Sequence, residues 1–198
     1  MYYLTTMPEA PQGYVNLSTA TAWNPWLGSV IPDTLQAEVR NRLRANLRHI
    51  LVGLEMKAAL VVPHGTRNGG PSVLFESYFS ILIFEFCVGV FSVCEGLGSA
   101  LWLHSQNNNG STTPRIFPGQ WIGALVAKAD PTGQLRLGDK VRGVKTVRDK
   151  IHQDKVGARL TIDWHEFGYE GAFVPAREAI AILLTLNAAS VPETTNLK

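Results

Sequence analysis

The stretch from Phe79 to Leu103 reads FSILIFEFCVGVFSVCEGLGSALWL, and it is the most apolar part of the chain. Glu85 and Glu95 are its only charged residues, and nine residues separate them. That run is far short of the ~20 residues that a membrane-spanning helix needs, and each ionised carboxylate would be costly in hydrocarbon. We therefore expect a helix from about Val73 to His104 that is buried on nearly all sides at the centre of a soluble, cytoplasmic protein with no membrane contact.

The segments on either side of this stretch also have helical periodicity. Apolar residues from Leu35 to Val61 recur every three or four positions, and Asp33 or Thr34 can cap the start of that helix. Further helices are expected over 118–129, 137–151 and 175–189, each from its apolar spacing or an opening proline. Residues 156–174 fit neither a helix nor a strand clearly. The pattern predicts an all-α protein, a four- to five-helix bundle.

The domain organisation predicted from the sequence has three parts. Residues 1–33 contain four prolines among several tyrosines and tryptophans and show no period, so we expect an irregular aromatic N-terminal arm that packs on the body or on a second subunit. Residues 34–190 form the helical bundle, and residues 191–198 are expected to be a disordered tail.

Composition excludes several classes of protein. Of the 198 residues, 45% are hydrophobic and 17% are charged, below the usual ~25%, which argues against general disorder. The net charge of +2 excludes a protein that is basic all over. Two cysteines, Cys87 and Cys94, exclude a disulfide scaffold, and they lie too far apart along one helix to bridge. Phosphate-loop, dinucleotide and nucleophilic-serine motifs are absent, so no cofactor is expected.

The segment that carries chemistry is VRDKIHQDK, residues 147–155. Arg148 and His152 are four residues apart and therefore share one helix face. Arg148 falls within the apolar sector of its helix, where a guanidinium is costly unless it is paired. Such a position often marks a polar site at a cleft or a subunit interface.

This segment resembles the signature of the HEPN superfamily, whose members are all-α bundles and include many metal-independent ribonucleases. In that signature an arginine, usually followed by a polar residue, precedes a histidine near the end of a late helix. Here three residues separate Arg148 from His152, one fewer than the usual minimum. The resemblance implies a homodimer whose paired Arg148 and His152 residues face a shared cleft, with RNA as substrate, no metal, and a toxin, defence or RNA-processing role. It also implies that Arg148, His152 and Asp149 are the catalytic residues, that Asp149 polarises or pairs with Arg148, and that Glu85 or Glu95 supplies a further, buried partner for Arg148.

Charge is unevenly distributed along the chain. Residues 136–159 hold eight basic and three acidic side chains, and arginines recur every four residues from position 40 to position 48. A basic stripe of this kind can follow a phosphate backbone, and Trp164, Phe167 and Tyr169 could stack on bases. The candidate nucleic-acid-binding residues are Arg40, Arg44, Arg48, Arg142, Lys145, Lys150 and Lys155.

Three alternatives remain open. Arg148 and His152 can be a structural charge network in a non-catalytic helical bundle that binds a ligand or another protein, and the aromatic arm favours this interpretation. The basic faces can simply be solvated helix surfaces. A metal site among Asp149, His152, Asp154, Asp163, His165 and Glu166 matches no known ligand spacing, so no metal is expected. An antitoxin or other protein partner cannot be identified from the sequence.

Overall fold

The computed structural model describes residues 3–5, 14–61, 73–112, 114–150 and 167–198. Within them lie six α-helices, α1 (Asn24–Val30), α2 (Ala37–Leu60), α3 (Val73–Ser105), α4 (Pro118–Ala129), α5 (Leu137–Asp149) and α6 (Val174–Leu184). Two three-residue strands, β1 (Tyr3–Thr5) and β2 (Tyr14–Asn16), pair in parallel, with Tyr3 opposite Tyr14. The all-α class and the helical bundle are confirmed.

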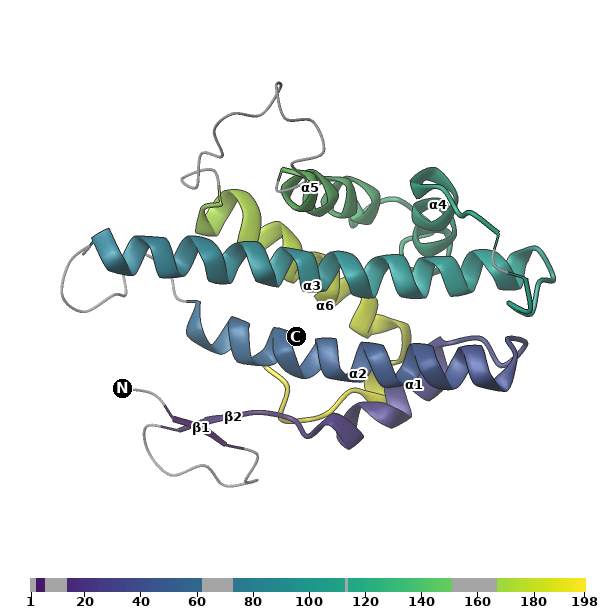
Figure 1. The fold of residues 1–198 in the computed structure, drawn as a ribbon, viewed down its shortest axis with the longest axis horizontal. Coiled ribbons are helices and arrows are strands. Elements are labelled where there is room, and N and C mark those ends of the chain that lie inside the picture. Colours follow the sequence, from purple (N-terminus) through teal and green to yellow (C-terminus); the bar gives the residue numbers. More distant parts are fainter. Residues whose placement is uncertain (1–2, 6–13, 62–72, 113, 151–166) are drawn as a thin grey trace.

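The long apolar helix α3 is the axis of the fold. It packs against α2, α4, α5 and α6, and Figure 1 shows α2 on one side of it and α4 and α5 on the other. Phe86, Val90 and Leu97 are almost fully buried along it. An apolar helix with little polar face gains most by burial on several sides, which explains its central position.

Two segments of the described residues are long and apolar enough to cross a membrane, judged by length and composition alone. They are Phe79–Ser105 and Tyr169–Ser190, with mean hydropathies of 1.9 and 1.4. In each segment, close to half of the most apolar 18-residue window is buried inside the fold: 50% of the window in the first segment and 44% in the second.

Helix α2 begins at Ala37, three residues after Thr34 and four after Asp33, the two expected caps. Its N-cap is Gln36, whose side chain makes no capping bond; the backbone N–H of Gln36 donates instead to the carbonyl of Asn109, at 2.8 Å, in the loop after α3. The position at which α2 begins is therefore set by a tertiary contact. The capping residues in the local sequence, Asp33 and Thr34, do not predict it. The predicted apolar stripe is present, with Leu47, Leu51 and Leu54 buried.

The aromatic arm is ordered over its described second half. A 3₁₀ turn (Ala20–Trp23) leads into α1, and Trp23 and Trp26 are fully buried with their rings edge to face at 5.9 Å. The expected packing of the arm on the body is confirmed, but this part of it is helical, because Pro25 starts a short helix and the two indoles anchor it.

The arm runs antiparallel to α2, and the chain's C-terminal residues close over the same helix. The Ser18 N–H donates to Glu55 Oε2 at 2.6 Å, and the Asn196 Nδ2 donates to the Glu55 carbonyl at 3.0 Å. Glu55 and Leu197 are fully buried. Residues 191–198, expected to be a disordered tail, are thus held by a buried leucine, by one hydrogen bond to α2 and by two from Arg177 of α6.

The last helix begins with a π-helical turn, Tyr169–Phe173, continues as α6 and ends in a 3₁₀ segment, Thr185–Ser190. It was expected as one helix from Pro175 to Ala189. Helix α5 ends at Asp149, close to the predicted end, and residues 151–166 lie outside the described residues. Lys140 of α5 pairs with Glu178 of α6 at 2.7 Å, which joins the two helices.

Candidate functional site

Arg148 lies in the last turn of α5. Leu137, Val141 and Val144 bury the inner face of this helix against the core. This packing brings the Arg148 guanidinium 5.1 Å from the centre of the Phe91 ring of α3. The Phe91 ring in turn meets Trp121 of α4 edge to face at 5.7 Å. The guanidinium therefore rests on an aromatic pair from two neighbouring helices, and 37% of the Arg148 side chain remains exposed.

The Asp149 carboxylate pairs with two cationic side chains in the last turns of α5, Lys145 and Arg148. Its carboxylate accepts a hydrogen bond from Arg148 Nη1 at 2.9 Å and another from Lys145 Nζ. Burial raises the pKa of Asp149, but the hydrogen bonds from Lys145 and Arg148 and the attraction to both charges outweigh it, so the pKa lies below its usual value. We call Lys145, Arg148 and Asp149 the Arg148 cluster.

The expected pairing of Arg148 with Asp149 is present, whereas Glu85 and Glu95 of α3 have other surroundings. Glu85 pairs with Lys57 of α2 at 3.5 Å, and Glu95 is exposed. Of the carboxylates expected beside Arg148, Asp149 of the same helix pairs with it.

Several predicted site residues lie outside the described residues: His152, Lys155, Trp164 and the acidic and histidine residues from 154 to 166. Across the part of the chain that the structure describes, no group of three or more metal-ligating side chains comes together.

The expected base-stacking role of Phe167 is contradicted by its burial. Phe167 is 1% exposed; its ring lies 5.4 Å from that of Phe84 and 5.8 Å from the Lys150 ammonium. Tyr169 is partly buried and packs on Phe173 at 5.3 Å. These rings belong to the core, and Lys150 covers one of them.

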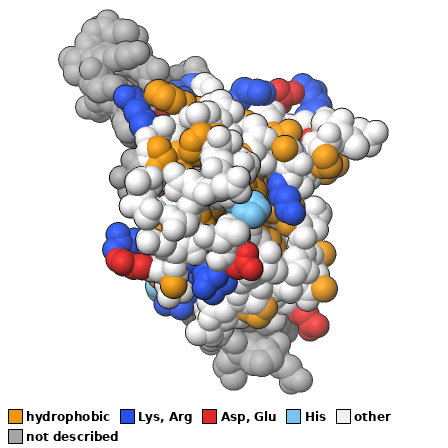
Figure 2. All heavy atoms as spheres, turned by 90° about the vertical axis from the view of Figure 1, so that its right-hand side faces the viewer, with side chains coloured by type: hydrophobic (Ala, Val, Ile, Leu, Met, Phe, Trp, Pro, Cys, Tyr) orange, Lys and Arg blue, Asp and Glu red, His pale blue; other side chains and the backbone are white. Residues whose placement is uncertain are grey.

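The candidate basic residues are divided between two sides of the bundle. Arg40, Arg44 and Arg48 lie on α2, whereas Arg142, Lys145 and Lys150 lie on or just after α5, and Figure 1 places these helices on opposite sides of α3. Arg40 and Arg44 donate to the carbonyls of Asp33 and Gly28, at 3.2 and 3.5 Å. On the face shown in Figure 2, basic side chains are scattered among neutral ones rather than gathered in one patch. A single strand following both helices would have to pass around α3.

The two cysteines are buried and free. Burial raises the pKa of both Cys87 and Cys94 to about 12, so both thiols stay protonated near neutral pH. Neither is suited to act as a nucleophile.

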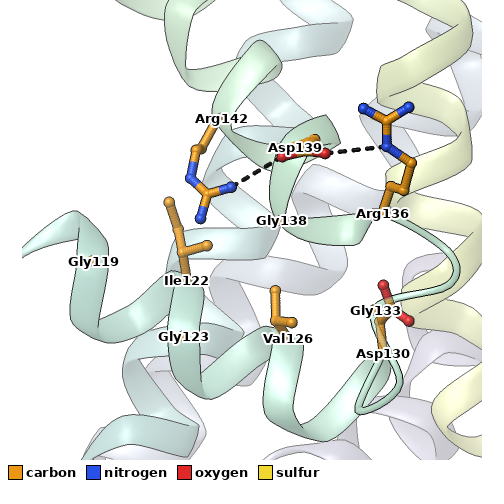
Figure 3. Close-up of a pocket in the computed structure, with 10 residues that line it drawn as sticks. All are labelled: Gly119, Ile122, Gly123, Val126, Asp130, Gly133, Arg136, Gly138, Asp139 and Arg142. Carbon is orange, nitrogen blue, oxygen red and sulfur yellow. Dashed lines mark hydrogen bonds and ion pairs between the residues drawn. The ribbon is translucent and has the colours of Figure 1, made fainter.

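A second feature, which sequence reasoning missed, is an open pocket of about 390 Å³ between α4 and α5. Figure 3 shows its lining: Ile122 and Val126 rise from α4, and Arg142 reaches toward them from α5. The Asp130 carboxylate, 2% exposed, accepts from the backbone N–H groups of Leu135 and Leu137 and fixes the turn between the helices. Gly119 and Gly123, one turn apart in so short a helix, were the signal in the sequence.

Comparison with known proteins gives no match: no family model, curated protein or solved structure is significantly similar to the chain.

Proposed function

We propose that this protein is a HEPN-like, metal-independent endoribonuclease, cytoplasmic and homodimeric, with Arg148 and His152 as its catalytic residues. One observation carries the proposal: Arg148 ends a late helix that packs on a long apolar central helix, and its guanidinium is held over Phe91 with part of the side chain open. A closing helix, α6, follows in the chain. This is the order of elements that the resemblance implies.

In the proposed reaction the 2′-oxygen of a ribose attacks the adjacent phosphorus. The new bond is 2′-oxygen to phosphorus, the bond to the 5′-oxygen breaks, and the products carry a 2′,3′-cyclic phosphate and a 5′-hydroxyl. His152 takes the 2′-hydroxyl proton, since the unperturbed pKa of histidine, ~6.5, suits proton transfer near neutrality. The departing 5′-oxygen takes a proton from a water molecule, and His152 returns its proton to the resulting hydroxide. Arg148 stabilises the charge that develops on the phosphate oxygens.

Asp149 acts as a positioning residue in this proposal. It fixes the Arg148 guanidinium from one side while Phe91 supports it from below. It also neutralises part of the positive charge of Lys145 and Arg148, so bound phosphate competes with this carboxylate for both cations.

The contacts of Arg148 also favour a second candidate function, a non-catalytic bundle that binds another protein or a ligand. In that case the contacts with Phe91 and Asp149 join α5 to α3 and serve only the fold. The two candidates differ in what the loss of the guanidinium does: the first predicts lost cleavage, and the second predicts only lower stability.

The test is RNA cleavage in excess EDTA by the wild-type protein, Arg148→Ala, His152→Ala and the matched control Arg42→Ala. Arg42 is 74% exposed and pairs with Glu38 on α2, across α3 from the candidate site. We expect cleavage with cyclic-phosphate ends from the wild type and the control, and loss of at least about a hundredfold in the two site variants.

Two outcomes would reject the ribonuclease proposal: no cleavage by the wild-type protein, or equal cleavage by all four proteins, which indicates a contaminating nuclease. Unfolding midpoints of the same variants separate loss of chemistry from loss of fold. A strictly monomeric mass in solution would reject the shared cleft.

A further inference from the structure

The segment that leads into α4 presents an aromatic ring to solvent. Phe117, the N-cap residue of α4, is 54% exposed, which makes it the most exposed large hydrophobic side chain of the described residues. Phe167 and Tyr169, by contrast, which were expected to stack on bases, pack in the core. Burial within the fold therefore does not account for the ring of Phe117.

Both the backbone and the ring of Phe117 have fixed neighbours. Pro118 favours extended backbone at the residue before it, and Phe117 has that conformation. The Phe117 N–H donates to Gln120 Oε1 at 2.8 Å, and the Arg115 guanidinium lies 5.1 Å from the centre of the Phe117 ring. A ligand that stacks on this ring meets a preorganised surface, which reduces the entropy lost on binding.

The charges around Phe117 favour a polyanion. Residues 96–129 contain no aspartate or glutamate, and Arg115 forms no ion pair within the described part of the chain. Glu38, which lines the groove beside the same segment, is already paired with Arg42 at 3.0 Å. A guanidinium next to an exposed ring supplies both parts that bind single-stranded nucleic acid, a cation for the phosphate and a π face for the base.

Phe117 is also connected to the proposed catalytic site through α4. It precedes Trp121 by four residues, which is about one turn of helix. The Trp121 ring meets that of Phe91, and Phe91 supports the Arg148 guanidinium. Figure 1 places α4 and α5 on the same side of α3. About one helical turn therefore separates the exposed ring from the aromatic pair on which Arg148 rests.

We propose that Phe117 stacks on an unpaired base of single-stranded RNA, while Arg115 contacts the adjoining phosphate. The inference rests on the proposed ribonuclease function, for which it names unpaired RNA as the substrate class and Phe117 as the residue that determines this preference. A base within a duplex is already stacked and paired, so it cannot lie on the Phe117 ring without leaving the helix. Every base has a π face, so the preference is for an unpaired strand rather than for one sequence.

The experiment measures binding of the full chain to a short single-stranded 2′-O-methyl RNA that contains 2-aminopurine, and to the same strand in a duplex. This probe has no free 2′-hydroxyl, so the proposed reaction cannot cleave it and the result does not depend on catalysis. Fluorescence anisotropy gives the affinity, and quenching of 2-aminopurine reports stacking on a ring. We expect the single strand to bind at least about tenfold more tightly than the duplex.

The decisive variant is Phe117→Ala, with Leu135→Ala as its matched control. Leu135 is 47% exposed and lies in the turn before α5, so its truncation removes exposed apolar surface without removing a ring. Phe117→Ala should weaken binding by roughly fivefold to a hundredfold, the effect of losing one base–aromatic stack. Phe117→Trp and Leu135→Ala should bind like the wild type. Arg115→Gln should reduce the slope of log affinity against log salt concentration by about 0.7, because one phosphate contact is lost.

The inference is overturned by equal wild-type affinity for single strand and duplex, by no binding to either, or by Phe117→Ala binding and quenching like the wild type. Cleavage of RNA combined with unchanged binding by Phe117→Ala would overturn the stacking site and leave the ribonuclease proposal in place. Binding that depends on Phe117 without any cleavage of RNA would support the stacking site and reject the ribonuclease proposal.

Discussion

Gly98→Ala tests how tightly α3 and α4 cross. The added Cβ would lie 2.6 Å from the Trp121 carbonyl oxygen and 3.0 Å from Cε3 of its ring, whereas ordinary contact begins at 3.4 Å. Because the nearest neighbour is backbone, α4 itself must move. Overpacking of a core typically costs about 1–3 kcal/mol, and the gain in helix propensity on replacing glycine returns about 1 kcal/mol. We place the cost at the upper end and expect a net loss of about 2 kcal/mol in the free energy of unfolding.

Two matched substitutions calibrate this prediction. Gly143→Ala meets nothing within 4 Å and should raise stability by about 1 kcal/mol. Gly89→Ala would meet the Leu54 Cδ2 at 2.8 Å, the end of a flexible side chain, and should fall between the two.

The assay is urea unfolding of the three variants, followed by circular dichroism at 222 nm and by tryptophan fluorescence. The expected order of stability is Gly143→Ala, then Gly89→Ala, then Gly98→Ala. A midpoint for Gly98→Ala at or above that of the wild type would refute the close α3–α4 crossing. The effect should also reach the Arg148 cluster, because Trp121 supports the Phe91 ring on which Arg148 rests.

Two further predictions concern the charged groups. The pKa of Asp149 is lowered in the folded protein. The carboxylate therefore contributes under about 1 kcal/mol of stability above its unfolded pKa, and this contribution is lost as the pH falls through the folded pKa. In a carbon-13 NMR titration, Arg148→Ala should raise the pKa of Asp149, and an unchanged pKa would contradict the pairing. Glu55→Ala should lower the free energy of unfolding by about 1–3 kcal/mol, because it leaves the buried Ser18 N–H without an acceptor. Glu55→Gln keeps an acceptor and should lower the free energy of unfolding by less. If thermal unfolding shows equal losses for the two variants, the hydrogen bond to Ser18 is not the cause of the lost stability.

The helices could be predicted closely where periodicity and turn residues agree. Helix α4 begins at Pro118 and ends before the Asp130-Pro131 turn as expected, since proline fixes the first turn and the turn residues break the helix. The sequence predicts less where contacts between residues far apart in the chain decide which side chains are buried. Nothing local to residues 191–198 indicates that Leu197 is fully buried, because α2 and the arm supply the surface that covers it.

The candidate site was predictable in part. Helical spacing indicated that Arg148 turns inward and needs a partner, and the neighbouring carboxylate Asp149 provides one. The ring under its guanidinium belongs to Phe91, 57 residues earlier in the chain, which no local pattern could identify. Similarly, the burial of Phe167 depends on Phe84 of α3.

By itself, the sequence determined that the chain forms an all-α bundle around one long apolar helix, because local periodicity dictates which face of each helix must be buried. The tertiary structure decided which of these faces meet. It divided the basic residues between two sides of α3, placed the rings of Phe167 and Tyr169 in the core, and opened a pocket beside Gly119 and Gly123. The physical reason is that propensity and amphipathicity act over a few residues, whereas the neighbours of a side chain come from helices distant in the chain.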